Sequence, residues 1–93
     1  MITAFVSIEA APDAIAELAP ALADIDGVRE AHSVAGGDVD LIGIVRVPSH
    51  EAFATVVTEK IAKLDGVRAT RTSIAFRSYS NDQLEAGYEG FGD

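Results

Sequence analysis

The sequence predicts an α+β fold in which one four-stranded antiparallel sheet carries two helices on the same face. The chain has 93 residues, enough for one domain and no more. Its apolar residues recur with the periods of strand, helix, strand, strand, helix and strand, in that order. The tetrapeptide Asp-Gly-Val-Arg occurs twice, at residues 26–29 and 65–68, each time between a helix and a strand. Two such strand–helix–strand halves make a ferredoxin-like βαββαβ fold.

The first half begins with alternation of apolar and polar residues over Ile2–Glu9, which predicts a strand. One face of this strand carries Ile2, Ala4, Val6 and Ile8. An apolar stripe of helical spacing follows between Pro12 and Asp24, and Gly27 lies where a helix-ending glycine belongs. We expect a kink or a break at Pro20, because proline inside a helix removes a hydrogen bond and clashes one turn back.

Two further strands, Val28–Gly36 and Val39–Val47, are expected to form a hairpin around a Gly-Gly-Asp turn. Ser49 is a plausible N-cap for a second helix that ends at Gly66. A final strand rich in Thr, Ile and Phe is expected from residue 67 to about residue 78.

The third strand is apolar on both faces, since Leu41 and Val45 lie in one phase and Ile42 and Ile44 in the other. Two helices on one side of the sheet leave the other face bare, and bare faces of antiparallel sheets are normally polar. Phe5 repeats this pattern on the first strand. We therefore expect a second copy of the sheet to cover this face, in an obligate dimer that forms a dimeric α/β barrel.

Composition excludes several function classes. There are 15 acidic and 7 basic residues, a formal net charge of −8, which argues against DNA, RNA and anionic membranes as partners. The absence of Cys removes disulfides, thiolate nucleophiles and Cys-based zinc sites. Without an apolar run of spanning length or a signal-peptide pattern, we expect a soluble cytoplasmic protein.

His32 and His50 are the only histidines, and their spacing fits neither a metal site nor a base with an orienting partner. His32 is expected to point to the same side of its strand as Val28 and Val34. The interpretation we prefer is one partly buried polar group and one surface group, with no catalytic residue, metal or cofactor.

The most distinctive polar segment is the expected hairpin turn. Gly36 and Gly37 allow positive φ and close approach of backbone N–H groups to a carboxylate, and Asp38 or Asp40 could take an ammonium. A ligand with both groups is an α-amino acid, although a tight turn with Asp as turn former explains the same residues. Thr70 and Thr72, in one phase of the last strand, could add hydroxyl groups, or serve only as strand formers.

The string from Ser33 to Ile42, SVAGGDVDLI, resembles the hairpin of the Lrp/AsnC regulators' effector domain, commonly V-T/S-G-x-x-D-L-L. Asp65-Gly66-Val67 followed by Thr-Arg-Thr at residues 70–72 resembles that family's P-G-V…T-x-T strand. The resemblance covers residues 2 to 80, and we expect residues 1–80 to form the ligand-binding and oligomerisation domain. Residues 81–93 are expected to form an acidic, glycine-containing tail.

The resemblance implies a regulatory module that binds an amino acid or related metabolite and assembles from homodimers into octamer-like rings. It implies that the effector binds between dimers, which here points to Gly36, Gly37, Asp38, Asp40, Thr70 and Thr72. Full-length members begin with a helix-turn-helix domain, whereas Met1 leads straight into the first strand. The chain therefore resembles the stand-alone members, with a full-length regulator as a further candidate partner. Gly36 and Val39 depart from the family's usual Thr/Ser and aromatic residues, which leaves the effector open.

Three alternatives remain open. Dimeric barrels of this topology also house small monooxygenases and isomerases, in which His32 or His50 would be the base. The chain could also be an oligomerisation module without a ligand. A third alternative, the ACT-type amino-acid-binding domain, has the same topology but lacks the hairpin resemblance.

Overall fold

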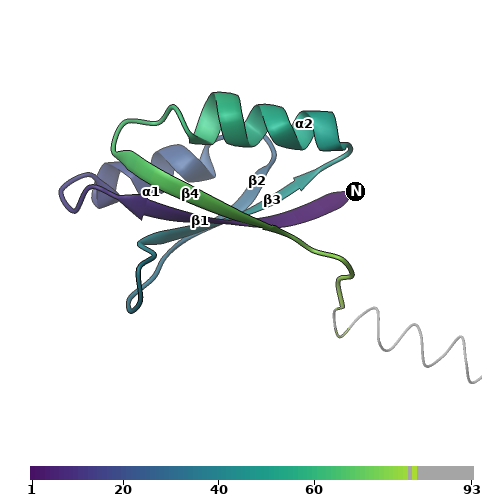
Figure 1. The fold of residues 1–93 in the computed structure, drawn as a ribbon, viewed down its shortest axis with the longest axis horizontal. Coiled ribbons are helices and arrows are strands. Elements are labelled where there is room, and N and C mark those ends of the chain that lie inside the picture. Colours follow the sequence, from purple (N-terminus) through teal and green to yellow (C-terminus); the bar gives the residue numbers. More distant parts are fainter. Residues whose placement is uncertain (80, 82–93) are drawn as a thin grey trace, which may run out of the picture.

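The elements follow one another in the predicted order (Figure 1). The computed structural model describes residues 1–79 and residue 81. The strands are β1 (Ile2–Ala10), β2 (Val28–Ser33), β3 (Leu41–Val47) and β4 (Val67–Ile74). The helices are α1 (Ile15–Ala23) and α2 (His50–Ala54), and α2 continues as a π-helix, η1 (Thr55–Ile61). The strands form one antiparallel sheet in the order β2-β3-β1-β4, which confirms the predicted fold class.

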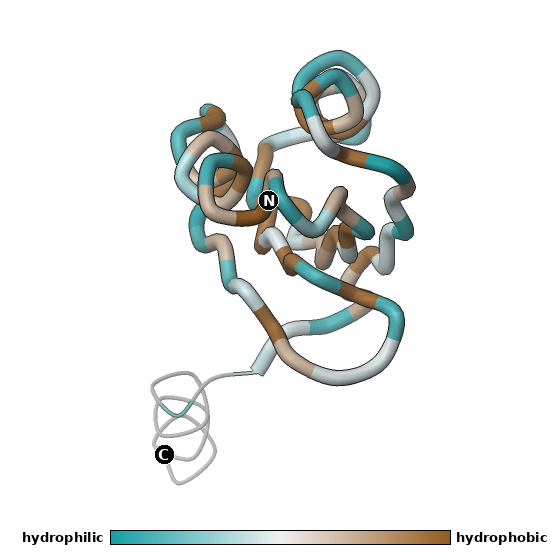
Figure 2. Tube along the Cα trace, turned by 90° about the vertical axis from the view of Figure 1, so that its left-hand side faces the viewer, coloured by the Kyte–Doolittle hydropathy of each residue, from teal (hydrophilic) through white to brown (hydrophobic). Residues whose placement is uncertain are grey.

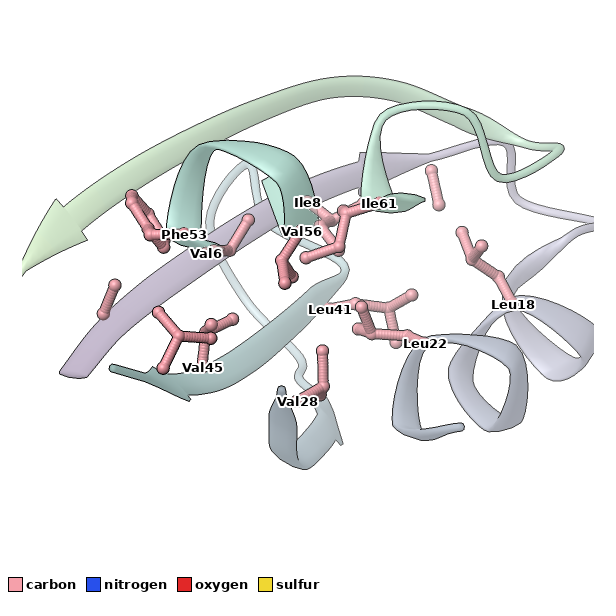
Figure 3. Packing of buried hydrophobic residues seen from close by; sticks show 13 residues of the cluster. Val6, Ile8, Leu18, Leu22, Val28, Leu41, Val45, Phe53, Val56 and Ile61 are labelled. Carbon is pink, nitrogen blue, oxygen red and sulfur yellow. The ribbon is translucent and has the colours of Figure 1, made fainter. Parts of the chain in front are cut away.

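The hydrophobic core lies between the sheet and the two helices, which cover the same face (Figures 1 and 2). The alternation in β1 and β3 decides which side chains enter it, because successive residues of a strand point to opposite faces. In β1 the buried residues are Ala4, Val6, Ile8 and Ala10, and in β3 the buried apolar side chains are Leu41, Val45 and Val47. The helices bury Leu18, Leu22, Phe53, Val56 and Ile61 against them (Figure 3).

Helix α1 runs through Pro20 without the predicted break. The Asp24 N–H donates to the Pro20 carbonyl at 3.1 Å, so the hydrogen-bonded chain continues past the proline. Pro20 is exposed, and the buried residues Leu18 and Leu22 flank it on the opposite side of the helix. Burial of this stripe holds the helix together where local propensity would end it. The helix also begins later than predicted, since Pro12 lies in the preceding turn.

The second helix begins as predicted, with the Ser49 hydroxyl accepting the Ala52 N–H at 3.1 Å. Its second part is not α-helical, and the Ala62 N–H donates to the Val57 carbonyl at 2.9 Å in the i→i+5 pattern. Thr55 and Thr58 each donate a side-chain hydroxyl to the carbonyl four residues back, a contact that bends helices. The wider turn leaves Lys60 exposed while Ile61 is fully buried.

The two copies of Asp-Gly-Val-Arg occupy equivalent places. Gly27 and Gly66 each lie between a helix and a strand with positive φ, at 100° and 94°. A Cβ on Gly66 would lie 2.5 Å from the Ala14 Cβ, and one on Gly27 would lie 3.0 Å from Val47 Cγ1. The repeat therefore marks two positions where both conformation and close packing require glycine.

Strand β2 corrects the predicted direction of His32. A bulge between Val28 and Glu30 shifts the pairing with β3, so that Val28 pairs with Val45 but His32 pairs with Ile42. Directly paired residues share a face, so Val28 enters the core and His32 lies on the open face of the sheet. A one-residue shift reverses every later side chain of a strand, and the sequence pattern did not reveal it. The expectation of a partly buried histidine was wrong, because both histidines are exposed.

The face of the sheet away from the helices, here called the open face, has an apolar centre, as predicted. Phe5 pairs with Ile44, and both lie on it together with Ile42. Phe5 is 41% exposed, and the two isoleucines are half-buried. Edge strand β4 ends at Ile74, earlier than predicted, and most of its side chains are exposed. Of the predicted tail, residues 81–93, all but residue 81 lie outside the described residues.

Candidate functional site

The β2–β3 loop, residues 34–40, is fixed at its base by three hydrogen bonds. The Val34 N–H donates to the Asp40 carbonyl at 3.0 Å, and the Asp40 N–H donates to the Ile8 carbonyl at 2.9 Å. The Asp40 carboxylate accepts the Ala10 N–H at 2.8 Å in a partly buried position. Asp40 therefore ties the loop to the end of β1, so its carboxylate orders the hairpin, whereas the sequence had left it open as a partner for a ligand ammonium.

The tip of the loop leaves its backbone accessible. Gly36 and Gly37 have φ of 100° and 70°, the positive values that glycine allows, although the loop at residues 34–40 is longer than the predicted Gly-Gly-Asp turn. Both are exposed, and a Cβ built on either would meet nothing within 4 Å. Their peptide groups can therefore approach a ligand from solvent or from another molecule.

Asp38 lies beside a small hollow on the sheet. Ser7, Glu9, Val39, Ala69 and Arg71 line this hollow together with Asp38. Its volume is about 10 Å³, close to that of one water molecule and far below that of an amino acid. The arrangement brings one cation and two carboxylates to the base of the loop, without an enclosed ligand pocket.

Thr70 and Thr72 lie on the other side of the sheet from this hollow. Thr70 pairs with Ile8 and Thr72 pairs with Val6, so both hydroxyls point to the face that carries the helices. Their neighbour Arg71 pairs with Ser7 on the open face. Within one chain the structure thus brings together the hairpin residues but does not add the two threonines to them.

Sequence reasoning gave no role to Glu9, Ser7 or Arg71. The strand alternation already separated Arg71 from the two threonines, but only the pairing of β4 with β1 places it near the loop. Two open clefts lie elsewhere, one of about 410 Å³ between α1 and residues 64–66 and one of about 300 Å³ beside η1. The second contains Arg46 and Lys60 together with Asp26.

The histidines form no site with one another. His32 Nε2 lies 3.2 Å from Glu30 Oε1 on the exposed edge strand β2, and His50 begins α2 on the far side of the sheet. Among residues 1–79 and 81, no three His, Asp or Glu side chains gather as a metal site would require. No helix in that part of the chain is long and apolar enough to span a membrane.

Comparison with known families shows which family of domains carries this loop. Residues 3–84 match the family model described as the Lrp/AsnC ligand binding domain. The chain belongs to the Lrp/AsnC ligand-binding family. The match confirms the resemblance of the hairpin and last strand, and it places this domain among those of transcription regulators.

Relatives of this Lrp/AsnC domain include an uncharacterized HTH-type transcriptional regulator of Pyrococcus furiosus, 39% identical over 77 residues. That alignment covers 80% of this chain and 51% of the relative, so the chain spans about half the length of the curated relatives it matches.

Among solved structures, TTHA0845 from Thermus thermophilus is 41% identical with a TM-score of 0.80. The alignment covers 87% of this chain and 100% of TTHA0845. A feast or famine regulatory protein from M. tuberculosis, complexed with L-methionine, is 29% identical with a TM-score of 0.71. In that comparison 89% of this chain covers 55% of the other.

Proposed function

We propose that this Lrp/AsnC domain binds an amino acid or a related small metabolite as an effector, at the β2–β3 loop. It does so as a homodimer that assembles further into an octamer-like ring, and a full-length Lrp/AsnC regulator is a candidate for co-assembly. The chain contacts no DNA through its own residues and catalyses no reaction. The complex of the M. tuberculosis relative with L-methionine supports an amino acid as the ligand class.

The observation that carries the proposal is the geometry of the loop. Its base is fixed to β1 through Asp40, and its tip presents the open backbone of Gly36 and Gly37. A fixed loop loses little conformational freedom when a ligand binds, which favours affinity. Backbone N–H groups suit a ligand carboxylate, and the exposed carboxylate of Asp38 suits its ammonium.

A second copy of the domain completes the site in this proposal. The hollow beside Asp38 is too small for an amino acid, and Thr70 and Thr72 face away from it. We expect the threonine hydroxyls that contact a ligand on the loop to come from a neighbouring protomer, because those of the same chain face away from it. Ligand affinity should therefore depend on assembly.

Thermal-shift screening against the proteinogenic amino acids, with L-methionine first, tests the function. A ligand at 100 times its dissociation constant stabilises the protein by about 2.7 kcal/mol, so a specific effector gives a clear shift in Tm. Calorimetric titration of the best ligand then compares wild type with Asp38→Asn and Thr72→Val. We expect each variant to lose about tenfold or more in affinity, because a hydrogen bond to a charged group contributes about 1.5–3 kcal/mol.

His32→Ala and His50→Gln serve as matched controls and should change affinity by no more than a few-fold. If affinity collapses with His32 and is indifferent to Asp38 and Thr72, the loop is not the site and an enzymatic function gains support. If no amino acid shifts Tm, the ligand class is wrong.

A further inference from the structure

The large apolar side chains that the described part of the chain leaves exposed are not scattered over its surface. They are Met1, Phe5, Ile74, Phe76 and Tyr79. The Ala75 N–H donates to the Thr3 carbonyl at 2.8 Å, so the end of β4 lies beside the start of β1. The exposed apolar side chains therefore gather at one end of the sheet. A concentration of this kind marks an interaction surface more often than isolated exposed residues do.

The segment Ala75–Tyr79, here called the arm, continues from β4 beyond the sheet. Phe76 is 97% exposed and Tyr79 is 71% exposed, so neither ring is packed against its own domain. Aromatic rings of this size contribute strongly to interfaces, and leaving them in water is unfavourable. The exposure of both rings is explained if the surface of another molecule packs against them.

The arm leaves the sheet on the side away from the helices (Figure 1). The β2–β3 loop projects to the same side from the opposite end of the sheet, and Figure 2 shows both below the layer of strands. Between them lies the open face with Phe5, Ile42 and Ile44. The open face thus has an apolar centre, with the β2–β3 loop projecting at one end and the arm at the other.

The arm and residues 1–74 carry net charges of opposite sign. Arg77 is the only charged residue of the arm, whereas residues 1–74 contain 11 acidic and 6 basic residues. A second copy of this chain therefore offers the arm both an apolar face and an excess of negative charge. In a two-fold pair each arm finds the same surface on its partner, so both contacts form at once.

We infer that the arm clasps a second copy of this chain, with Phe76 and Tyr79 packed against the protomer that sits on the open face. The inference rests on the proposed dimer and adds to it, because contact between open faces alone does not require the arm. The arm raises dimer affinity and holds the partner on the open face.

The first test is the dimer dissociation constant, measured by light scattering or sedimentation across a dilution series of the full chain. The variant Phe76→Ser/Tyr79→Ser is compared with Ser78→Ala, a matched change at an exposed uncharged position between them. We expect the dissociation constant to rise at least tenfold for the aromatic double variant and to change by no more than a few-fold for Ser78→Ala. Because both rings are exposed, the circular dichroism of the double variant should remain that of wild type.

The second test identifies what the arm touches. Phe76 is replaced by a photo-crosslinking phenylalanine analogue, and unlabelled and ¹⁵N-labelled copies of this protein are then mixed. We expect crosslinked peptides that join labelled to unlabelled copies and map to the open face or to residues 34–40. Crosslinks confined to single copies would show that the arm folds back on its own sheet, and would overturn the inference.

The outcomes separate the arm from the rest of the proposal. A double variant that dimerises as tightly as wild type overturns the role of the arm and leaves the dimer standing. A wild-type chain that is monomeric at every concentration overturns both, while the amino-acid titrations still decide ligand binding.

Discussion

At the scale of single residues, one carboxylate adds a side-chain hydrogen bond to the two backbone hydrogen bonds that hold the candidate loop. Asp40 bonds the Ala10 N–H, 30 positions away in the chain, and its own N–H bonds Ile8. Asp38, two residues earlier, is exposed at the rim of the hollow. Two acidic residues of the same turn thus have different tasks, one structural and one available to a ligand.

Asp40→Ala should lower the free energy of unfolding by about 1–3 kcal/mol, because it leaves the partly buried Ala10 N–H without its acceptor. Urea denaturation of the variant measures the loss. Asp38→Ala is the matched control and should stay within about 0.5 kcal/mol of wild type. Equal effects of the two changes would contradict the structural role of Asp40.

Alanine substitutions at two glycines with positive φ, Gly37 and Gly66, distinguish the free-energy cost of backbone strain from that of steric overlap. Gly37→Ala meets open space, so it should cost only the backbone strain of about 1–2 kcal/mol. Gly66→Ala carries the same strain and also overlaps the Ala14 Cβ, so it should cost about 1–3 kcal/mol more. Denaturant midpoints of the two variants provide the comparison, and a Gly66→Ala variant as stable as Gly37→Ala would show that α1 moves away freely.

At the scale of elements, α1 and η1 depart from regular α-helical sequence rules, and packing explains both. Helix α1 contains a proline at its sixth position and continues because Leu18 and Leu22 are buried. Helix η1 widens its turns over a β-branched stretch and still buries Val56 and Ile61. The sheet dictates which side chains must be covered, and the helices adapt to it.

Pro20→Ala should raise the free energy of unfolding by about 1–3 kcal/mol, because it restores the hydrogen bond to the Ala16 carbonyl and removes the ring clash. The exposed position of Pro20 means that the substitution removes no core contact. Thermal denaturation checks the direction, and Ala21→Pro, at the adjacent exposed position, should destabilise strongly. A less stable Pro20→Ala variant would show that the ring itself supports the fold.

At the scale of the whole molecule, the described chain has one core and a second apolar surface. The helices cover one face of the sheet, and the open face is left with an apolar centre and a charged rim that includes Glu9, Glu30 and Arg71. An apolar centre with a polar rim is the usual anatomy of an interface between proteins. The obligate dimer remains a prediction that follows from this pattern.

Ile44→Lys, in the centre of the open face, should convert the dimer to a monomer, because the dimer would have to bury a charge without a partner. Light scattering at micromolar concentration distinguishes the two states. Ala54→Lys, an exposed position on the helix side, is the control and should leave the dimer intact. A wild-type chain that is a folded, monodisperse 9.7 kDa species under these conditions would refute the obligate dimer.

The 93-residue chain should show no measurable affinity for duplex DNA at physiological salt, because its net charge of −8 repels the phosphate backbone. A gel-shift titration over a range of salt concentrations tests this. Micromolar binding that weakens steeply with salt would contradict it.

Much of this architecture follows from the sequence by itself. The alternation in β1 and β3, the helix-ending glycines and the repeat of residues 26–29 and 65–68 determine the element order and the core face. The apolar residues of both phases in β3 also predict that a partner covers the open face. These features depend on local periodicity and backbone conformation, which nearby residues specify.

Only the tertiary structure decided how the segments are set against one another. The bulge in β2 placed His32 on the open face, and the pairing of β4 with β1 separated Thr70 and Thr72 from the loop while bringing Arg71 to it. The partner of the Asp40 carboxylate lies on another strand, at Ala10. Such relations depend on the register between distant strands, and a shift of one residue reverses them without changing the pattern of any single segment.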